Sequence, residues 1–170
     1  MARREPLLYS EVQALRQWHT RILLAFPPAA MLFIALRQMV WHKPWGNPPM
    51  SNGGLIFLTV LLLAVYFRLI TVKLVTELGP RELTVGLHGL WKQRRIPLEQ
   101  IHSAAVVTYD ALADFGGYGI RSGRRGAGYI ARGNQAVELT LANGRKVLIG
   151  SQKPVELARK ITEQRKQVQA

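Results

Sequence analysis

The chain has 170 residues, 48% of them hydrophobic, and its 23 Lys and Arg against 10 Asp and Glu give a formal net charge of +13. This length suits one compact domain with a few extra elements and argues against a multidomain enzyme. Because cysteine is absent, disulfides, thiolate metal sites and cysteine nucleophiles are excluded. The positive charge favours an anionic partner, such as phospholipid headgroups, nucleic acid or an acidic protein.

Residues 1–21 are expected to form a cytosolic or interfacial segment. Residues 10–13 have the form of a capping box, and apolar residues recur at helical spacing from Val12 to Ile22. The pattern predicts an interfacial helix that leads into the apolar region. The alternative is that Val12 and Leu15 dock on the protein's own domain.

Residues 22–72 are typical of a transmembrane helical hairpin. Two runs, at 22–40 and 54–72, are apolar except for Arg37 and Arg68 near their ends. At ~1.5 Å per residue, each run is about 29 Å long, which matches the hydrocarbon core of a bilayer. The alternative, two buried helices of a soluble domain, leaves too little polar chain to cover both.

Pro27 and Pro28 interrupt the first of these runs. Proline removes a backbone donor and clashes with the preceding turn, although transmembrane helices tolerate it where neighbours bond the freed carbonyls. The pair therefore predicts either a kink in the first helix or a helix that begins at Pro27.

The connection between the two runs, residues 41–53, is rich in Pro, Gly and Asn and predicts a tight non-helical loop. More basic residues lie before the first run and after the second run than in the loop between them. The positive-inside bias therefore places both termini in the cytoplasm. The apolar run begins too late for a cleaved secretory signal. The expected membrane-interface anchors are Trp18, Trp41, Trp45 and Arg68.

Residues 73–170 are expected to form a cytosolic domain that is mainly β and folds by itself. Asn143-Gly144 lies between two apolar runs and is a strong hairpin signal, because both turn residues accept positive φ. Residues 154–168 have the spacing of an amphipathic helix, with Pro154 in its first turn. Strands are predicted at residues 73–78, 83–90, 91–96, 101–109, 136–141 and 146–149. With the glycine-rich stretch these make about seven antiparallel strands capped by a C-terminal helix.

Several short motifs give this outline a family resemblance. They are PLEQI at 97–101, FGGYGIR at 115–121, NGRK at 143–146, IGSQKP at 149–154 and the loop motif GNP at 46–48. With the two-span layout, they resemble a family of small bacterial membrane proteins that carry a bacterial PH-like cytosolic domain. No activity or catalytic residues are established for that family. The resemblance therefore implies a fold, a PH-like domain on a membrane hairpin, and a location, the bacterial inner (plasma) membrane.

Residues 116–133 hold the densest mixture of glycine and arginine. Glycines let backbone amides approach a ligand, and arginines bind phosphate through charge-assisted hydrogen bonds. The alternative is that the glycines form turns and bulges in a bent sheet while the arginines face water or lipid. The glycine spacing is not that of a dinucleotide-binding motif, because the third glycine comes one residue late and no helix is expected after it. The candidate contacts to anionic headgroups are Arg121, Arg124, Arg125 and Arg132.

No pattern predicts catalysis, a cofactor or a metal site. The four histidines are scattered, without the HxxxH or HExxH spacing of a metal site. Asp110 and Asp114 would be the pair for acid/base chemistry, but carboxylates before glycines are more often turn and capping groups.

We therefore expect a membrane-anchored, non-catalytic PH-like module that recruits a protein partner or anionic lipid headgroups. One alternative is an accessory or assembly subunit of a larger membrane complex, with the small residues Ala25, Ala29, Ala30 and Ala35 allowing close helix approach. A remote alternative is a membrane-tethered nucleic-acid binder. It would use the basic residues Lys92, Arg94 and Arg95 with the aromatic faces of Trp91, Tyr118 and Tyr129. An anionic leaflet already accounts for a basic surface, which disfavours that alternative.

Overall fold

The computed structural model describes residues 6–14, 18–89, 93–123 and 125–169, without the side chains of 18–20. The chain divides into a helical unit, Arg16–Thr71, and a β unit that combines Met1–Leu15 with Val72–Ala170. The helical unit is therefore inserted into the β unit along the sequence.

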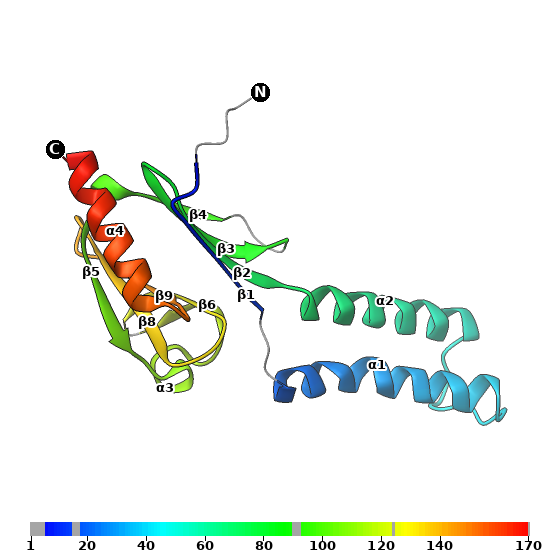
Figure 1. Ribbon diagram of the computed structural model, residues 1–170. Helices are drawn as coiled ribbons and strands as arrows, with labels where there is room; N and C mark the ends of the chain where they lie inside the picture. Colours follow the sequence, from blue (N-terminus) through cyan, green and yellow to red (C-terminus); the bar gives the residue numbers. More distant parts are fainter. Residues whose placement is uncertain (1–5, 15–17, 90–92, 124, 170) are drawn as a thin grey trace. The chain divides into compact units, whose positions relative to one another are not determined.

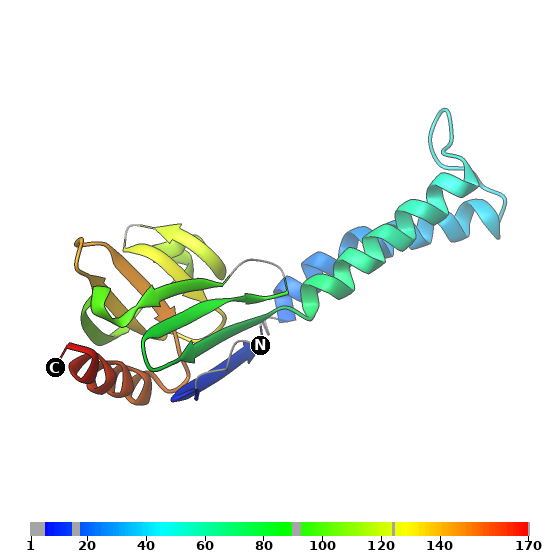
Figure 2. The same ribbon diagram turned by 90° about the horizontal axis from the view of Figure 1, so that it is seen from above.

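The helical unit is a hairpin of α1 (Trp18–Met39) and α2 (Asn52–Ile70). The two helices run antiparallel and pack side by side (Figures 1 and 2). Both are long and apolar enough to cross a membrane, over Arg21–Met39 and Asn52–Ile70. Because α1 runs through both prolines, the alternative of a helix beginning at Pro27 is wrong.

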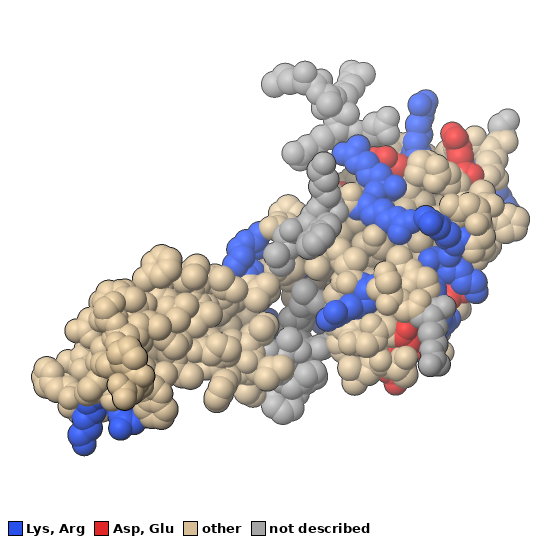
Figure 3. Space-filling model, turned by 180° about the vertical axis from the view of Figure 1, so that it is seen from behind, with Lys and Arg blue, Asp and Glu red and all other residues tan. Residues whose placement is uncertain are grey.

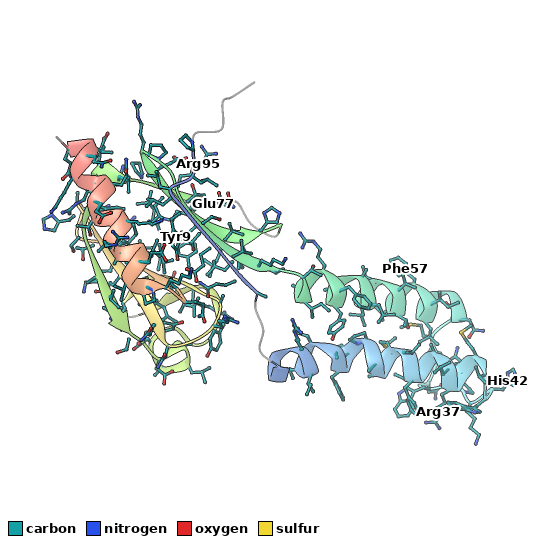
Figure 4. All side chains as sticks on the ribbon, viewed as in Figure 1. Tyr9, Arg37, His42, Phe57, Glu77 and Arg95 are labelled. Atoms are coloured by element: carbon teal, nitrogen blue, oxygen red, sulfur yellow. The ribbon has the colours of Figure 1, made fainter. Side chains whose placement is uncertain are left out.

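The outer surface of the hairpin is apolar. Phe57 of α2 is exposed and points away from α1 (Figure 4), and Phe26 and Phe33 of α1 are exposed as well. Thr59 is buried, where its hydroxyl donates to the carbonyl of Leu55 at 2.7 Å. On the face in Figure 3, the hairpin carries Lys and Arg only near its ends. Such a surface suits hydrocarbon better than water.

The loop at the tip of the hairpin is held by polar residues from both helix ends. Gln38 Nε2 donates to the carbonyl of Met50 at 2.7 Å and to Asn52 Oδ1 at 2.8 Å. Ser51 caps α2 by accepting from the backbone of the first turn. Arg37 lies over the ring of Trp45, 5.1 Å from its centroid.

The β unit contains two sheets and, in the described residues, nine strands (Figure 1). The first sheet has the order β1 (Tyr9–Ala14), β2 (Lys73–Leu78), β3 (Glu82–His88), β4 (Arg94–Pro97). The second has the order β5 (Ile101–Thr108), β8 (Gln135–Leu141), β9 (Lys146–Gly150), β7 (Gly126–Ile130), β6 (Gly119–Gly123). All neighbouring strands are antiparallel except β7 and β9. The helical elements are η1 (Leu98–Gln100), α3 (Ala111–Phe115) and α4 (Pro154–Gln169).

The main core combines the inner faces of both sheets with one face of α4. Leu74 and Leu83 come from the first sheet, Ile149 from the second and Leu157 from α4, and all four are fully buried. A smaller core, formed by Phe115, Ile130, Leu148 and their neighbours, lies beneath α3. The mainly β domain with a C-terminal helix is therefore confirmed, although it has more than seven strands.

The segment before α1 forms strand β1, so the expected interfacial helix is wrong for residues 9–14. Strand β1 pairs antiparallel with β2 from Tyr9↔Leu78 to Ala14↔Lys73. Six residues of ladder outweigh the local helical signals, because side chains on alternate positions of β1 are buried in the β unit. The fold of residues 73–170 is thus completed by a strand from outside that range.

The strongest local signals are confirmed. Strand β8 turns into β9 at Asn143-Gly144, where Gly144 has φ +76° and its N–H donates to the carbonyl of Leu141 at 2.9 Å. The C-terminal helix begins at Pro154 as expected and buries Leu157, Ala158 and Ile161.

Candidate functional site

The glycine-rich segment folds into the β6–β7 hairpin, and its glycines allow close packing. A Cβ on Gly128 would lie 2.8 Å from the ring of Phe115, and one on Gly123 would collide with the carbonyl oxygen of Asp114. Gly126 has φ +95° and lies directly against the carbonyl of Lys146. These contacts favour the alternative in which the glycines shape a bent sheet.

Arg125 lies inside an ion-pair network on the outer face of the second sheet. Its Nη2 is 3.1 Å from Glu138 Oε2, and its Nη1 donates to the carbonyl of Thr108 at 3.0 Å and lies 3.5 Å from Asp114 Oδ2. Lys146 Nζ bonds the other oxygen of Glu138 at 2.9 Å. The Glu138 side chain is 12% exposed, so removing one partner would leave a poorly hydrated charge. Through these contacts, Arg125 has a structural role in the β unit.

The other arginines of the segment are not brought together into one site. Arg121 is exposed, and its Nε donates to the carbonyl of Tyr118 at 3.1 Å. Arg132 is exposed, and its carbonyl accepts from the Tyr109 hydroxyl at 3.4 Å. Arg124 lies outside the described residues. Arg121 and Arg132 therefore remain as candidate surface contacts for an anion.

The two aspartates before the glycines hold α3 in place. Asp110 is its N-cap and accepts from the N–H of Ala113 and of Leu112, which lowers the pKa of the Asp110 carboxyl. Asp114 accepts from the N–H of Asp110 at 3.1 Å. The expectation that they are capping groups is confirmed. Beside them, burial raises the pKa of Tyr109 to about 12.

The predicted membrane anchors whose side chains the structure describes are exposed. Trp41 and Trp45 are exposed beside the loop, and Arg68 is exposed in the last turn of α2. The Trp18 side chain lies outside the described residues.

Within the described ranges, no group of three or more His, Asp or Glu could hold a metal ion.

The surface proposed for nucleic acid loses one of its three aromatic faces. Tyr129 is 6% exposed and belongs to the main core, so its expected role in stacking on bases is wrong. Arg95 is 3.6 Å from Glu82. Trp91 and Lys92 lie outside the described part of the chain.

A polar cluster that the sequence did not suggest joins β1 to the turn before α4. Glu11 accepts from the hydroxyls of Tyr9 and Ser151 at 2.7 and 2.6 Å, and from the N–H of Gln152 at 2.7 Å. Gln13 is buried and donates to the carbonyl of Gly150 at 2.7 Å. Burial and the bond to Glu11 raise the pKa of the Tyr9 hydroxyl. The sequence has no apolar alternation that marks this strand, because two of its three inward residues, Glu11 and Gln13, are polar and its outward Val12 is 57% exposed.

No protein-family model and no curated protein matches the chain.

Proposed function

We propose that the chain is a membrane-anchored, non-catalytic PH-like module that recruits a protein partner. One observation carries the proposal: two apolar helices are inserted into a β unit that has its own core. A four-stranded antiparallel meander, a second sheet and a C-terminal helix support the PH-like assignment. Sheets of this kind bind peptides and proteins through their edges and loops.

The arginine contacts favour a protein over a lipid headgroup as the principal ligand. A headgroup pocket needs several convergent cations, but Arg125 is engaged with Glu138 and Asp114. Anionic headgroups are the second candidate because Arg121 and Arg132 are exposed.

An accessory or assembly subunit of a membrane complex is the alternative from another class. Its interface would be the hairpin, whose apolar surface includes the exposed residues Leu32 and Val60. Ala35 is buried and is not available to a further helix, whereas Ala29 is exposed.

The proposed location is the bacterial inner membrane, with both termini in the cytoplasm. Because the chain has no cysteine, single cysteines at the exposed positions Met50 and Ala142 can report the topology. We expect a membrane-impermeant thiol reagent to label Met50→Cys in intact spheroplasts, and Ala142→Cys only after permeabilisation. Labelling of Ala142→Cys before permeabilisation, with Met50→Cys protected, would show the opposite topology. Protection of both cysteines would contradict a hairpin that crosses the membrane.

The choice between ligands can be tested with the full chain in nanodiscs, using an environment-sensitive dye on Ser122→Cys beside Arg121. Each basic residue near an anionic leaflet contributes about 1 kcal/mol, so Arg121 and Arg132 together give ~2 kcal/mol, about a thirtyfold effect. If a protein partner is the principal ligand, we expect the same dye signal in neutral and in phosphatidylglycerol-rich discs at physiological salt. A shift in anionic discs that Arg121→Gln with Arg132→Gln abolishes would favour headgroups instead. A shift that the double variant retains would reflect the general charge of the β unit.

A further inference from the structure

Strand β5 is an outer strand of the second sheet, and its length and composition are those of a strand that can pair on both sides. It runs along one edge of the β unit (Figure 1). With eight residues, Ile101–Thr108, it is the longest described strand, and its sequence IHSAAVVT contains no Asp, Glu, Lys, Arg or Pro. Long uncharged edges pair readily with other strands, and proteins usually protect them.

The three other edges of the two sheets carry such protection. β1 is tied through Glu11 and Gln13 to residues 150–152. β4 is short and has the sequence RRIP, whose charges and proline discourage pairing. β6 has five residues, with a glycine at each end and an arginine at its centre. β5 has a register shift with β8 only at its first residues, between Ile101 and Ser103, and is regular from Ser103 to Thr108, where it carries no charge and no proline.

The backbone of β5 offers hydrogen-bonding groups to a further strand. The N–H of Tyr109 donates to the carbonyl of Asn134, at the β8 side. In an antiparallel pair, the backbone groups of successive residues point alternately toward and away from the partner strand. The register of β5 with β8 is regular from Ser103 to Thr108 and shifts between Ile101 and Ser103, so Ser103, Ala105 and Val107 bond β8 and the residues between them face the open edge. Arg125 bonds the carbonyl at one end of β5, and Arg165 bonds the carbonyl of Ile101 at the other at 3.4 Å. The open groups in the regular part of the strand are those of Ala104 and Val106.

Opposite charges flank the two ends of this strand. Arg165 of α4 lies at the Ile101 end, and Asp110 follows the strand at the other end. Asp110 is ionised at neutral pH, since its pKa is lowered by two N–H bonds. Among the described residues, neither Arg165 nor Asp110 has an ion-pair partner.

We infer that β5 pairs antiparallel with β5 of a second copy of the chain. Antiparallel pairing around a two-fold axis brings Arg165 of each copy toward Asp110 of the other, whereas parallel pairing would place like charges together. The small side chains of Ala104 and Ala105 at the centre allow close approach of the strands. The pairing continues one sheet through both copies and places two membrane hairpins in one assembly. It concerns the β unit alone and goes beyond the proposed recruitment of another protein.

Disulfide trapping of the full chain in native membranes tests the pairing. In an antiparallel dimer, only the residue near the two-fold axis lies opposite its own copy, within the ~4.5–5.5 Å between Cα atoms that a disulfide accepts. We expect single cysteines from Ser103 to Val107 to give crosslinked dimer with a maximum at Ala104, Ala105 or Val106. Ser122→Cys, on the protected edge β6, is the matched control for Ser103→Cys. Crosslinking at β5 no stronger than at Ser122→Cys would overturn the inference.

A charge on the edge provides the second measurement. Val106 is 45% exposed and Ile120, on β6, is 36% exposed, so Lys is tolerated by the fold at both positions. Val106→Lys places like charges together across the two-fold axis and is expected to shift the full chain in detergent from dimer to monomer, measured by light scattering. Ile120→Lys is expected to remain dimeric. A wild-type monomer, or a Val106→Lys dimer, would show that β5 does not pair with itself and would leave its edge to another protein.

Discussion

The β unit without β1, residues 73–170 alone, is expected to lose most of its stability. Tyr9 and Gln13 are buried in the complete unit, and Glu11 and Gln13 together make three hydrogen bonds with residues 150–152. Burial of one large side chain contributes about 2 kcal/mol, and each hydrogen bond about 1 kcal/mol. Their combined loss, on the order of 5 kcal/mol, equals the whole stability of many domains.

The control for this comparison is a protein that keeps β1 but lacks the helical hairpin. Because Ala14 and Lys73 are cross-strand partners, a short Asn-Gly turn can replace residues 15–72 and join β1 directly to β2. We expect this joined unit to unfold cooperatively in urea, followed by circular dichroism, and residues 73–170 alone to be unfolded or to have a much lower midpoint. Equal midpoints for the two proteins would mean that β1 adds nothing to the core.

Gly126→Ala is expected to be the most damaging single substitution in the glycine-rich segment. Gly126 has φ +95°, and its Cβ would collide with the carbonyl of Lys146 on β9. The unfavourable backbone conformation and the collision with backbone atoms together predict a loss of about 3 kcal/mol or more. Neither atom of the collision lies at the end of a flexible side chain, so repacking cannot relieve it.

Gly79→Ala is the control for this substitution. A Cβ on Gly79 meets the carbonyl of Glu82 at 3.5 Å, an ordinary contact. We expect thermal unfolding of the full chain in mild detergent to show a lowered midpoint for Gly126→Ala and little change for Gly79→Ala. A wild-type midpoint for Gly126→Ala would contradict the close approach of β7 to β9.

The elements that could be predicted are those whose physical cause is local in the sequence. The helical hairpin follows from two apolar runs with charges at their ends, the β8–β9 hairpin from Asn143-Gly144, and α4 from its apolar spacing after Pro154. In each case, neighbouring residues supply both the signal and most of the contacts.

Strand β1 could not be predicted because its energy comes from residues far away in the chain. Its ladder forms with β2 across the whole hairpin, and Glu11 and Gln13 find their partners at residues 150–152. The local capping pattern points to a helix, but it contributes less than a complete ladder and a buried tyrosine.

The glycine-arginine segment shows the same division between local pattern and tertiary contact. Its composition suits both a phosphate site and a tightly packed hairpin, since either use needs backbone without side chains. The position of Phe115 against Gly128 and of Glu138 against Arg125 decides between them. Composition determines that this stretch is basic and conformationally permissive. Only the packing of α3 and β8 determines which of its charges face the protein and which face the solvent.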